Sequence, residues 1–474
     1  MSPRKRCHRK TAPSTMRLER LERRLPLAGN VTAELTGSTL RLTGDHLAND
    51  VMVASAAGGT IAVIGIDTTV NGRQAAFVTT EAVTSIVTKL KGGDDAVGFG
   101  NSAADYLSQR QLTSLATSPV VWSEDPPAPF DVAAVQARID EVAGGATTFS
   151  IPGSLRVKTG DGNDAVGISG NVGGSIIVNL GSADAGNGLV IGSETLAGRV
   201  GAGITVNGGD RNDLVAIGNM SVAGTVSASL GDGINWMNVM GGDDAPTTIA
   251  ALAYTGGVDE DGVGLMGNVT VRNNVRIFTG VRGEDEVDFF SNLRSAVFGG
   301  GVKVRGNVVV NTGTGSDGDT VRLVGNFRGD VSVTTGGGRD TVSVSSYVGW
   351  VSTDGSDPVP LVEVVGWSAI GLDLNINTGA GNDLISIGTS TVGRDATIHA
   401  ESGDDDVRID SMQVKRNLSV NLGAGNDSLA VMNLRAFAAF FYGGSGTNTL
   451  STDAATRAGS RTLRKFQFQV VSNG

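Results

Sequence analysis

The residues best suited to chemistry in this chain are aspartates that close glycine-rich turns. Three similar nonapeptides, GDGNDAVGI at 160–168, GAGNDLISI at 379–387 and GAGNDSLAV at 423–431, place an aspartate two residues after the second glycine. Carboxylate and carbonyl oxygens are the hard ligands that Ca²⁺ prefers, and Ca²⁺ tolerates irregular geometry. The pattern therefore predicts one row of calcium ligands, at Asp164, Asp213, Asp340, Asp383, Asp405 and Asp427.

The same aspartates also have a use that needs no metal. Asp and Asn side chains bind backbone amides of an adjoining turn, and this alone would explain their place beside glycines. Carboxylates stacked one strand spacing apart either raise their pKa values or take up a counter-ion. The sequence leaves both interpretations open.

The chain has few residues that are suited to other catalytic chemistry. The single cysteine, Cys7, excludes an intrachain disulfide framework and a zinc site of several thiolates, and only three histidines are present. Two acidic runs lie next to an arginine: Glu284-Asp285-Glu286 with Arg282, and Asp404-Asp405-Asp406 with Arg408. Such groups would suit a polysaccharide lyase or glycosidase on a parallel β-helix. The alternative interpretation of each run is a solvated corner.

The spacing of the turns indicates a repeat protein. Between consecutive turns the aspartate position advances by 21 to 23 residues, as from Asp383 to Asp405 and from Asp405 to Asp427. A fixed period of this size is typical of solenoids. Looser copies of the motif have an acid or amide at Asp50, Asp95, Asn187, Asp213, Asn235, Asp285, Asp319, Asp340, Asp405 and Asn448.

Within a unit the apolar residues alternate with period two. Leu374 and Ile376 precede one turn, and Val407 and Ile409 follow the next. Alternating aliphatic residues between Gly/Asn/Asp clusters predict half-buried strands. Such a unit is too thin to bury its apolar face alone, so neighbouring units must stack. The predicted fold is all-β, a right-handed parallel β-helix of about 22 residues per coil and 12 to 15 coils.

The breaks in the rhythm give the expected organisation. We predict a basic leader at 1–33, a solenoid at 34–452, and a terminal cap strand and tail at 453–474. One insertion, about 102–150, contains a helix that starts after Asp131 and stops at Gly144-Gly145. Smaller insertions are expected at about 241–267 and 346–366.

The charge is unevenly divided along the chain. Residues 1–24 contain nine Lys or Arg and two Glu, a net charge of +7; since the whole chain carries −11, the remainder carries −18. An acidic body repels nucleic acid and anionic membranes. No apolar stretch reaches the ~18 residues of a spanning helix, so we expect neither a nucleic-acid partner nor a transmembrane segment.

Two family resemblances follow from these motifs. The glycine–aspartate units resemble the hemolysin-type (RTX) calcium-binding nonapeptide, which implies Ca²⁺ held between coils by turn carbonyls and aspartates. Here Thr159, Thr335, Thr378 and Leu422 replace the first glycine, and Asn448 replaces one aspartate. The segment LERRLPLAGNVTA at 21–33 resembles the LEPR-type leader of large surface or secreted proteins of planctomycetal bacteria, with Arg23 and Pro26 as departures.

These observations favour a non-enzymatic protein of the cell surface or extracellular space. Its expected role is structural, adhesive or matrix-forming, with Ca²⁺ at the repeated turns and polysaccharide or other surface components as partners. The leader resemblance implies export. The alternative is the carbohydrate-active enzyme described above, and the sequence leaves the oligomeric state open.

Overall fold

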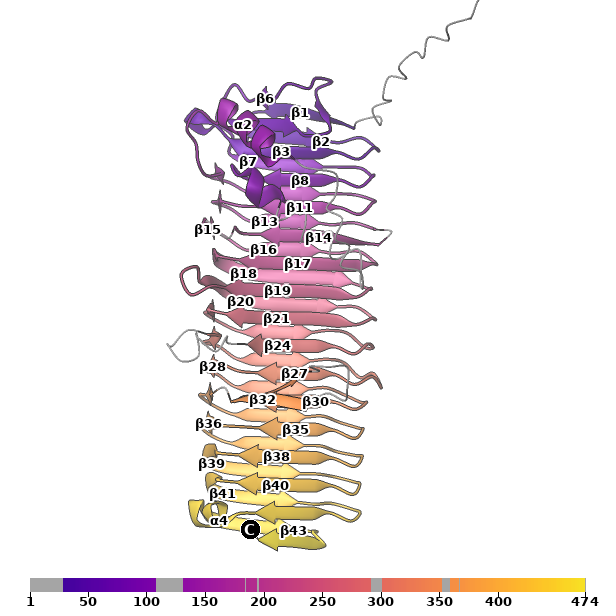
Figure 1. Ribbon diagram of the computed structural model, residues 1–474, viewed down its shortest axis with the longest axis vertical. Coiled ribbons are helices and arrows are strands. Elements are labelled where there is room, and N and C mark those ends of the chain that lie inside the picture. The colour runs from indigo at the N-terminus through magenta and orange to yellow at the C-terminus, as the bar shows by residue number, and fades with distance from the viewer. Residues whose placement is uncertain are drawn as a thin grey trace, which may run out of the picture.

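The computed structural model describes residues 29–107, 131–183, 185–193, 196–290, 301–351, 359–365 and 367–473. The chain winds into one column of stacked coils, with its first strands at one end and its last strands at the other (Figure 1). Strands make up 54% and helices 7%, and the column is a β-solenoid of about 12 turns with about 24 residues per turn. The predicted all-β solenoid is confirmed. The average coil exceeds 22 residues because inserted segments lengthen several coils.

Each regular coil has a short strand, a long strand and a strand of a second sheet. In one coil these are β36 (Ser390–Val392), β37 (Ala396–His399) and β38 (Asp406–Asp410). A two- to three-residue corner, here called the short-strand corner, joins the first two, and the glycine turn joins the last two. Figure 1 places the short-strand corners along one edge of the column and the glycine turns along the opposite edge.

The short and long strands, together with β1 (Asn30–Thr36), form a 25-stranded sheet. Its long strands are β2 (Thr39–Thr43), β7 (Ser85–Lys89), β10 (Leu155–Lys158), β13 (Ile176–Asn179), β16 (Ile204–Asn207), β23 (Val275–Phe278), β26 (Val308–Asn311), β29 (Val331–Thr334), β34 (Leu374–Asn377), β37 and β43 (Ser460–Phe466). Its short strands are β5 (Thr69–Val70), β9 (Ser150–Ile151), β12 (Asn171–Val172), β15 (Gly198–Val200), β22 (Val269–Val271), β25 (Lys303–Val304), β28 (Asn326–Phe327), β33 (Ser368–Ile370) and β36. Four strands run through both positions: β18 (Met220–Gly231), β20 (Thr247–Gly256), β39 (Met412–Asn421) and β41 (Arg435–Tyr442).

The second sheet follows the glycine turns. Its strands are β3 (Asp50–Ser55), β8 (Ala96–Phe99), β11 (Ala165–Ile168), β14 (Gly186–Ile191), β17 (Asn212–Gly218), β19 (Asn235–Gly241), β21 (Asp261–Gly267), β24 (Glu286–Phe290), β27 (Thr320–Leu323), β30 (Thr341–Val344), β35 (Leu384–Ile387), β38, β40 (Ser428–Met432), β42 (Thr449–Thr452) and β44 (Val470–Asn473). Successive strands pair in parallel without a register slip, for example Ile385 with Val407 and Val407 with Leu429.

The core is a set of aliphatic columns. Because side chains alternate across a strand, every second residue points inward, and parallel register places it on its equivalent in the next coil. Val407 and Ile409 are at most 1% exposed, as are Ile385, Ile387 and Leu429 in the adjoining coils. One buried cluster contains these side chains and extends from Val31 to Leu450.

The interruptions differ in kind. Helix α2 (Val132–Ala143) lies in the predicted insertion; Asp131 caps it by accepting the Ala134 N–H, and Gly144 ends it in the left-handed conformation, as expected. Segment 346–366 contributes an antiparallel pair, β31 (Ser346–Val351) and β32 (Val359–Val365). The insertion predicted at 241–267 is wrong, because β20 and β21 pair with both neighbouring coils and the extra residues occupy only the corner before β20.

Different elements lie at the two ends of the column. At the start of the column, β1 (Asn30–Thr36) pairs antiparallel with β2, and β4 (Ile61–Gly65) pairs antiparallel with β3 and with β6 (Phe77–Val78). The one-turn helix η1 (Ala57–Gly59) lies between β3 and β4 in the chain. At the end, the helical turn α4 (Ala454–Gly459) precedes β43 and β44, which pair with β41 and β42. The expected terminal strand is thus accompanied by a helical turn and a second strand. The predicted leader lies almost wholly outside the described residues, among which no helix is long and apolar enough to cross a membrane.

Candidate functional site

The aspartates of the glycine turns form a buried ladder parallel to the column axis. Each stands at the end of its turn, beside or at the first residue of a second-sheet strand. All six predicted calcium ligands are at most 2% exposed, although their neighbours in the turns are mostly exposed. The ladder is therefore an interior feature of the turn edge.

One carboxylate oxygen of each aspartate binds the backbone of the preceding coil. The N–H of Asp383 donates to Asp405 Oδ1 at 2.9 Å, and the N–H of Asp405 donates to Asp427 Oδ1 at 3.0 Å. The Asp427 N–H continues the series to Asn448 Oδ1 at 2.9 Å. The same bond joins Asp95 to Asp164, Asp164 to Asn187, Asp213 to Asn235, Asp261 to Asp285, Asp285 to Asp319, Asp319 to Asp340 and Asp340 to Asp383.

Where the residue before the aspartate is Asn or Asp, it makes the same bond in the opposite direction. The N–H of Asp404 donates to Asn382 Oδ1 of the preceding coil at 2.8 Å, and that of Asn426 donates to Asp404 Oδ1 at 2.7 Å. Asn163 and Asp94 are joined in this way near the other end. The Asn-Asp dipeptide of the motif thus binds one coil on each side, and this gives both residue types a structural role.

Threonines bind the second carboxylate oxygen in several coils. Thr279, Thr312 and Thr335 lie five to seven residues before Asp285, Asp319 and Asp340, and each hydroxyl is 2.5 Å from Oδ2 of its aspartate. The Thr335 hydroxyl also lies 3.3 Å from the carbonyl of Thr378 in the next coil. Thr335, one of the threonines that replace the first glycine of the nonapeptide, therefore belongs to the ladder.

Five ladder aspartates have no threonine at the equivalent position, and in two of them, Asp213 and Asp261, the N–H of Gly209 or Gly257 binds Oδ2 instead. Leu90, Ala400 and Leu422 occupy the threonine position before Asp95, Asp405 and Asp427. In the described part of the chain, Oδ2 of each of these three carboxyl groups is buried and accepts no hydrogen bond. Oδ2 of Asp164 and Oδ2 of Asp383 are likewise buried without a hydrogen bond, although Thr159 and Thr378 stand five residues before them.

Burial controls the ionisation of the ladder. It raises the pKa of Asp405 to about 7, and repulsion from Asp383 and Asp427 adds to the effect. Burial also raises the pKa of Asp383 and of Asp427. A neutral carboxyl can donate a hydrogen bond, which a carboxylate cannot. The pKa is likewise raised by burial to about 7 for Asp95, Asp164, Asp261, Asp285 and Asp319, and to about 6 for Asp213 and Asp340.

The hydrogen bonds reduce the number of predicted calcium ligands that still have an oxygen available for a cation. Asp340 has both oxygens in hydrogen bonds, and Asp213 accepts the N–H of Gly209 besides the amide of Asn187. Asp164, Asp383, Asp405 and Asp427 each keep one buried oxygen free of hydrogen bonds, so a cation would find a ligand there. The described residues contain no cluster of three or more His, Cys, Asp or Glu arranged around one point. Calcium binding stays a prediction.

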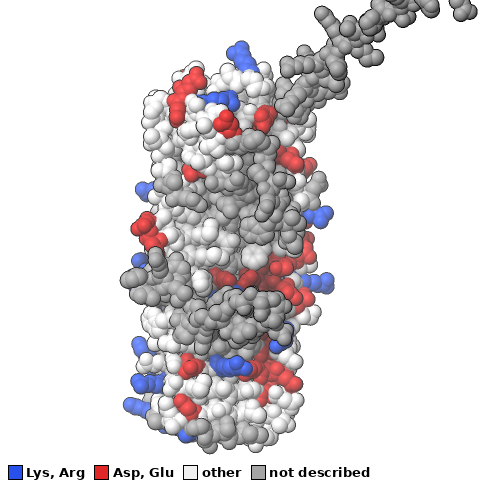
Figure 2. Space-filling view, viewed as in Figure 1, with Lys and Arg blue, Asp and Glu red and all other residues white. Residues whose placement is uncertain are grey.

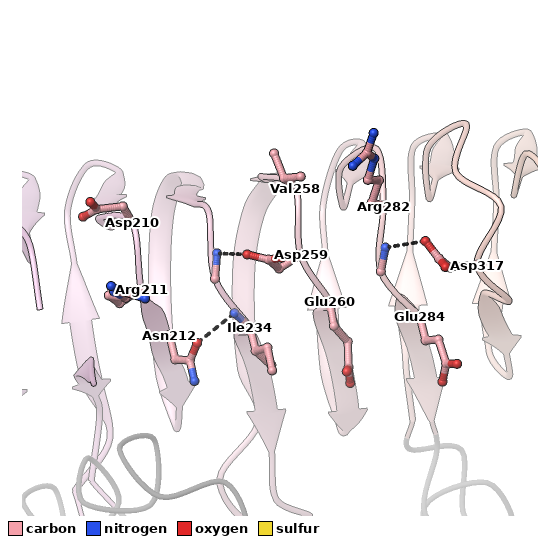
Figure 3. Close-up of a pocket in the computed structure, with 12 residues that line it drawn as sticks. Asp210, Arg211, Asn212, Ile234, Val258, Asp259, Glu260, Arg282, Glu284 and Asp317 are labelled. Atoms are coloured by element: carbon pink, nitrogen blue, oxygen red, sulfur yellow. Dashed lines mark hydrogen bonds between the residues drawn. The ribbon is translucent and has the colours of Figure 1, made fainter. Parts of the chain in front are cut away.

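The two acidic runs do not converge on single sites. Glu284 and Arg282 lie on the surface, where they line a shallow open cavity of about 630 Å³ with Asp210, Asp259 and Asp317 (Figure 3). Asp285 is in the buried ladder, whereas Glu286 extends from β24 and pairs with Arg322.

The second run divides in the same way. Asp404 accepts the N–H of Asn426, Asp405 is buried, and Asp406 pairs with Arg408 at 2.5 Å. The three consecutive acids therefore lie in three different places: Asp404 in the turn, Asp405 in the interior and Asp406 on the sheet surface. Within the described residues neither run forms a pair of facing carboxylates.

Sequence reasoning missed a second ladder, at the short-strand corners. The N–H of Asp395 donates to Asp373 Oδ1 at 3.0 Å, and the N–H of Asn417 donates to Asp395 Oδ1 at 3.0 Å. Asn307, Asp330 and Asp373 continue it in the preceding coils. The 22-residue interval from Asp373 through Asp395 to Asn417 is the signal that could have revealed it.

Similarity to other proteins adds nothing to this geometry: no family model, no curated protein and no solved structure matches the chain.

Proposed function

We propose that this chain is a non-enzymatic structural rod of the cell surface or extracellular space. The main support is the continuity of its stabilising contacts: the aliphatic core and the aspartate ladder pass through nearly every coil. Such a stack resists bending because each coil is bonded to both neighbours. The acidic runs, which an enzyme would gather into one site, are divided among the turn, the interior and the sheet surface. The leader-like segment at 21–33 and the acidic body support export.

Fractionation of the source cells tests this function. Antibodies against the solenoid should label intact cells or the culture medium, and external protease should remove the signal without lysis. A signal confined to lysed cells would contradict the proposal. Turnover of any member of a panel of polyuronides and sulfated polysaccharides by the purified chain would also contradict it and would favour the carbohydrate-active enzyme.

Calcium is proposed as a stabiliser of the threonine-free part of the ladder. A cation beside Asp405 and Asp427 would favour their ionised forms, which burial disfavours. We expect the thermal midpoint at pH 7.5 to be several degrees higher in millimolar Ca²⁺ than in chelator, and Asp405→Asn combined with Asp427→Asn to remove the difference. Replacing the exposed Asp161 and Asp232 by Asn is the control. A midpoint that does not respond to Ca²⁺ would eliminate the metal and leave the rod.

A further inference from the structure

Exposed cations follow the short-strand corners in the C-terminal half of the solenoid. We name this row the basic edge. Its side chains stand one or two residues after a short strand, or after the short-strand part of β39, and all are exposed; they are Arg272, Arg305, Arg328, Arg394, Lys415 and Arg416. Three aspartates share these corners, but each accepts a backbone N–H of the next coil and is half-buried.

Most of these cations are not used inside the molecule. Arg394 pairs with Asp373 at 3.3 Å. Among the described residues, Arg272, Arg305, Arg328, Lys415 and Arg416 make no ion pair. Exposed like charges repeated coil after coil destabilise the compact state by repulsion. The basic edge is therefore best explained as a binding surface for another molecule.

The glycine-turn edge carries the opposite charge. We name this row the acidic edge, and its exposed members are Asp210, Asp232, Asp259, Glu284 and Asp317. Only two basic residues, Arg211 and Arg282, stand among them in the same coils, and the row borders the shallow cavity described above. Figure 2 shows acidic side chains gathered toward the turn edge, and basic ones along the opposite edge in the lower half.

We propose that the basic edge binds the acidic edge of a second copy of this chain, so that rods associate side by side. Both edges repeat with the same coil, because parallel strands fix the spacing at ~4.8 Å. One cation row can therefore meet one anion row over several coils without a mismatch. An arginine is long enough to enter the shallow acidic cavity, where its guanidinium would lie beside Asp259, and arginines of neighbouring coils would meet Asp210 and Asp317 farther along the row.

The positions of the acidic edge and the basic edge along the column define how two rods would pack. The acidic edge occupies the five glycine turns from β16 to β27, and the basic edge occupies corners from β22 to β39. Their centres differ by about three coils, or ~14 Å, at that strand spacing. Two parallel rods would thus pack with this stagger. Because a pair of rods keeps one basic edge and one acidic edge free, the contact does not close and generates a ribbon.

The experiment uses two charge-reversal variants of the purified full chain. One is Arg272→Glu with Arg305→Glu and Arg328→Glu, and the other is Asp210→Lys with Asp232→Lys and Glu284→Lys. In sedimentation velocity at pH 7.5 and 50 mM salt, the unaltered chain should self-associate, and 0.5 M salt should abolish this. Each variant alone should associate at least about tenfold more weakly, since three contacts become repulsive.

Mixing the two variants in equal amounts is the decisive step, because complementary edges are then restored between unlike rods. Association of the mixture to the level of the unaltered chain is the expected result, and it also proves that both variants are folded. The control Arg156→Glu with Lys158→Glu and Arg276→Glu changes the net charge equally on the exposed sheet face. It should associate normally.

Two outcomes overturn the proposal: an unaltered chain that stays monomeric at low salt, or a mixture that stays monomeric although both variants melt cooperatively. Binding of heparin, used as a polyanion probe, to a monomeric chain would assign the basic edge to an anionic polysaccharide instead. The inference extends the proposed rod function but is measured on purified protein, so its failure leaves the location test unaffected.

Discussion

Replacing Gly381 by alanine should lower the free energy of unfolding by about 3 kcal/mol or more, a large effect for one methyl group on a surface turn. Gly381 has φ of +147°, and a Cβ built there would lie 1.4 Å from the carbonyl oxygen of Gly338 in the preceding coil. The turn would have to separate from the preceding coil and break two bonds to it, Ala380 N–H to the Gly336 carbonyl and Gly338 N–H to the Ala380 carbonyl. Chemical denaturation followed by circular dichroism measures the change.

Gly37→Ala separates the two causes of this loss. Gly37 also has a positive φ, +57°, but nothing lies within 4 Å of a Cβ at this position. It should cost only about 1 kcal/mol, the conformational penalty alone. Limited proteolysis should place new cleavage near residue 381 in the first variant, because stability in a stack is local. Equal losses in both variants would show that coil-to-coil contact is not the cause.

The metal-free solenoid should be more stable at pH 5 than at pH 8. Burial raises the pKa of Asp95 and Asp405 to about 7 and that of Asp213 and Asp340 to about 6, all above the ordinary 3.8, so the folded state binds more protons than the unfolded state between these values. The free energy of unfolding therefore falls as pH rises through this window and is lowest above it. Denaturation midpoints in chelator at half-unit intervals of pH test the direction. A midpoint that rises from pH 5 to pH 8 would contradict it.

Asp405→Asn isolates one member of the ladder. The amide keeps the Oδ1 acceptor and cannot ionise; at the same position of other turns, Asn235 and Asn448 donate Nδ2 hydrogens to turn carbonyls. The variant should gain about 1–2 kcal/mol at pH 8 and nothing near pH 4. Asp404→Asn removes the same charge from the exposed neighbour, and an equal gain there would mean that net charge, not burial, is responsible.

Much of the fold follows from local pattern. Alternation such as Leu374/Ile376 requires strands, the 22-residue interval requires stacking, and Asp131 with Gly144 defines a helix. The interval failed at 241–267, because a longer corner before β20 resembles an insertion although the strand pattern continues beyond it. Periodicity shows only the spacing between repeats, and a longer corner can contain extra residues while the strands on either side of it stay paired in the stack.

The sequence predicted the positions of the site residues better than it predicted their roles. The sequence located the aspartates but not their burial, because a motif cannot show whether a turn side chain points toward solvent or between coils. In the sequence, Thr335 is only a departure from a calcium motif, and its bond to Asp340 is visible only in the folded turn. The opposite bonding directions of Asn382 and Asp383 depend on the neighbouring coils, which only the three-dimensional stack supplies.

The in-register pairing of neighbouring coils has an evolutionary consequence. Residues 384–405 and 406–427 are blocks of equal length, each ending in a ladder aspartate and beginning with a second-sheet strand. Loss or duplication of such a block in the gene would join surfaces that already match, so the reach of the molecule could change by one coil without new compensating substitutions. Length is thus a trait that selection can adjust in small, equal increments.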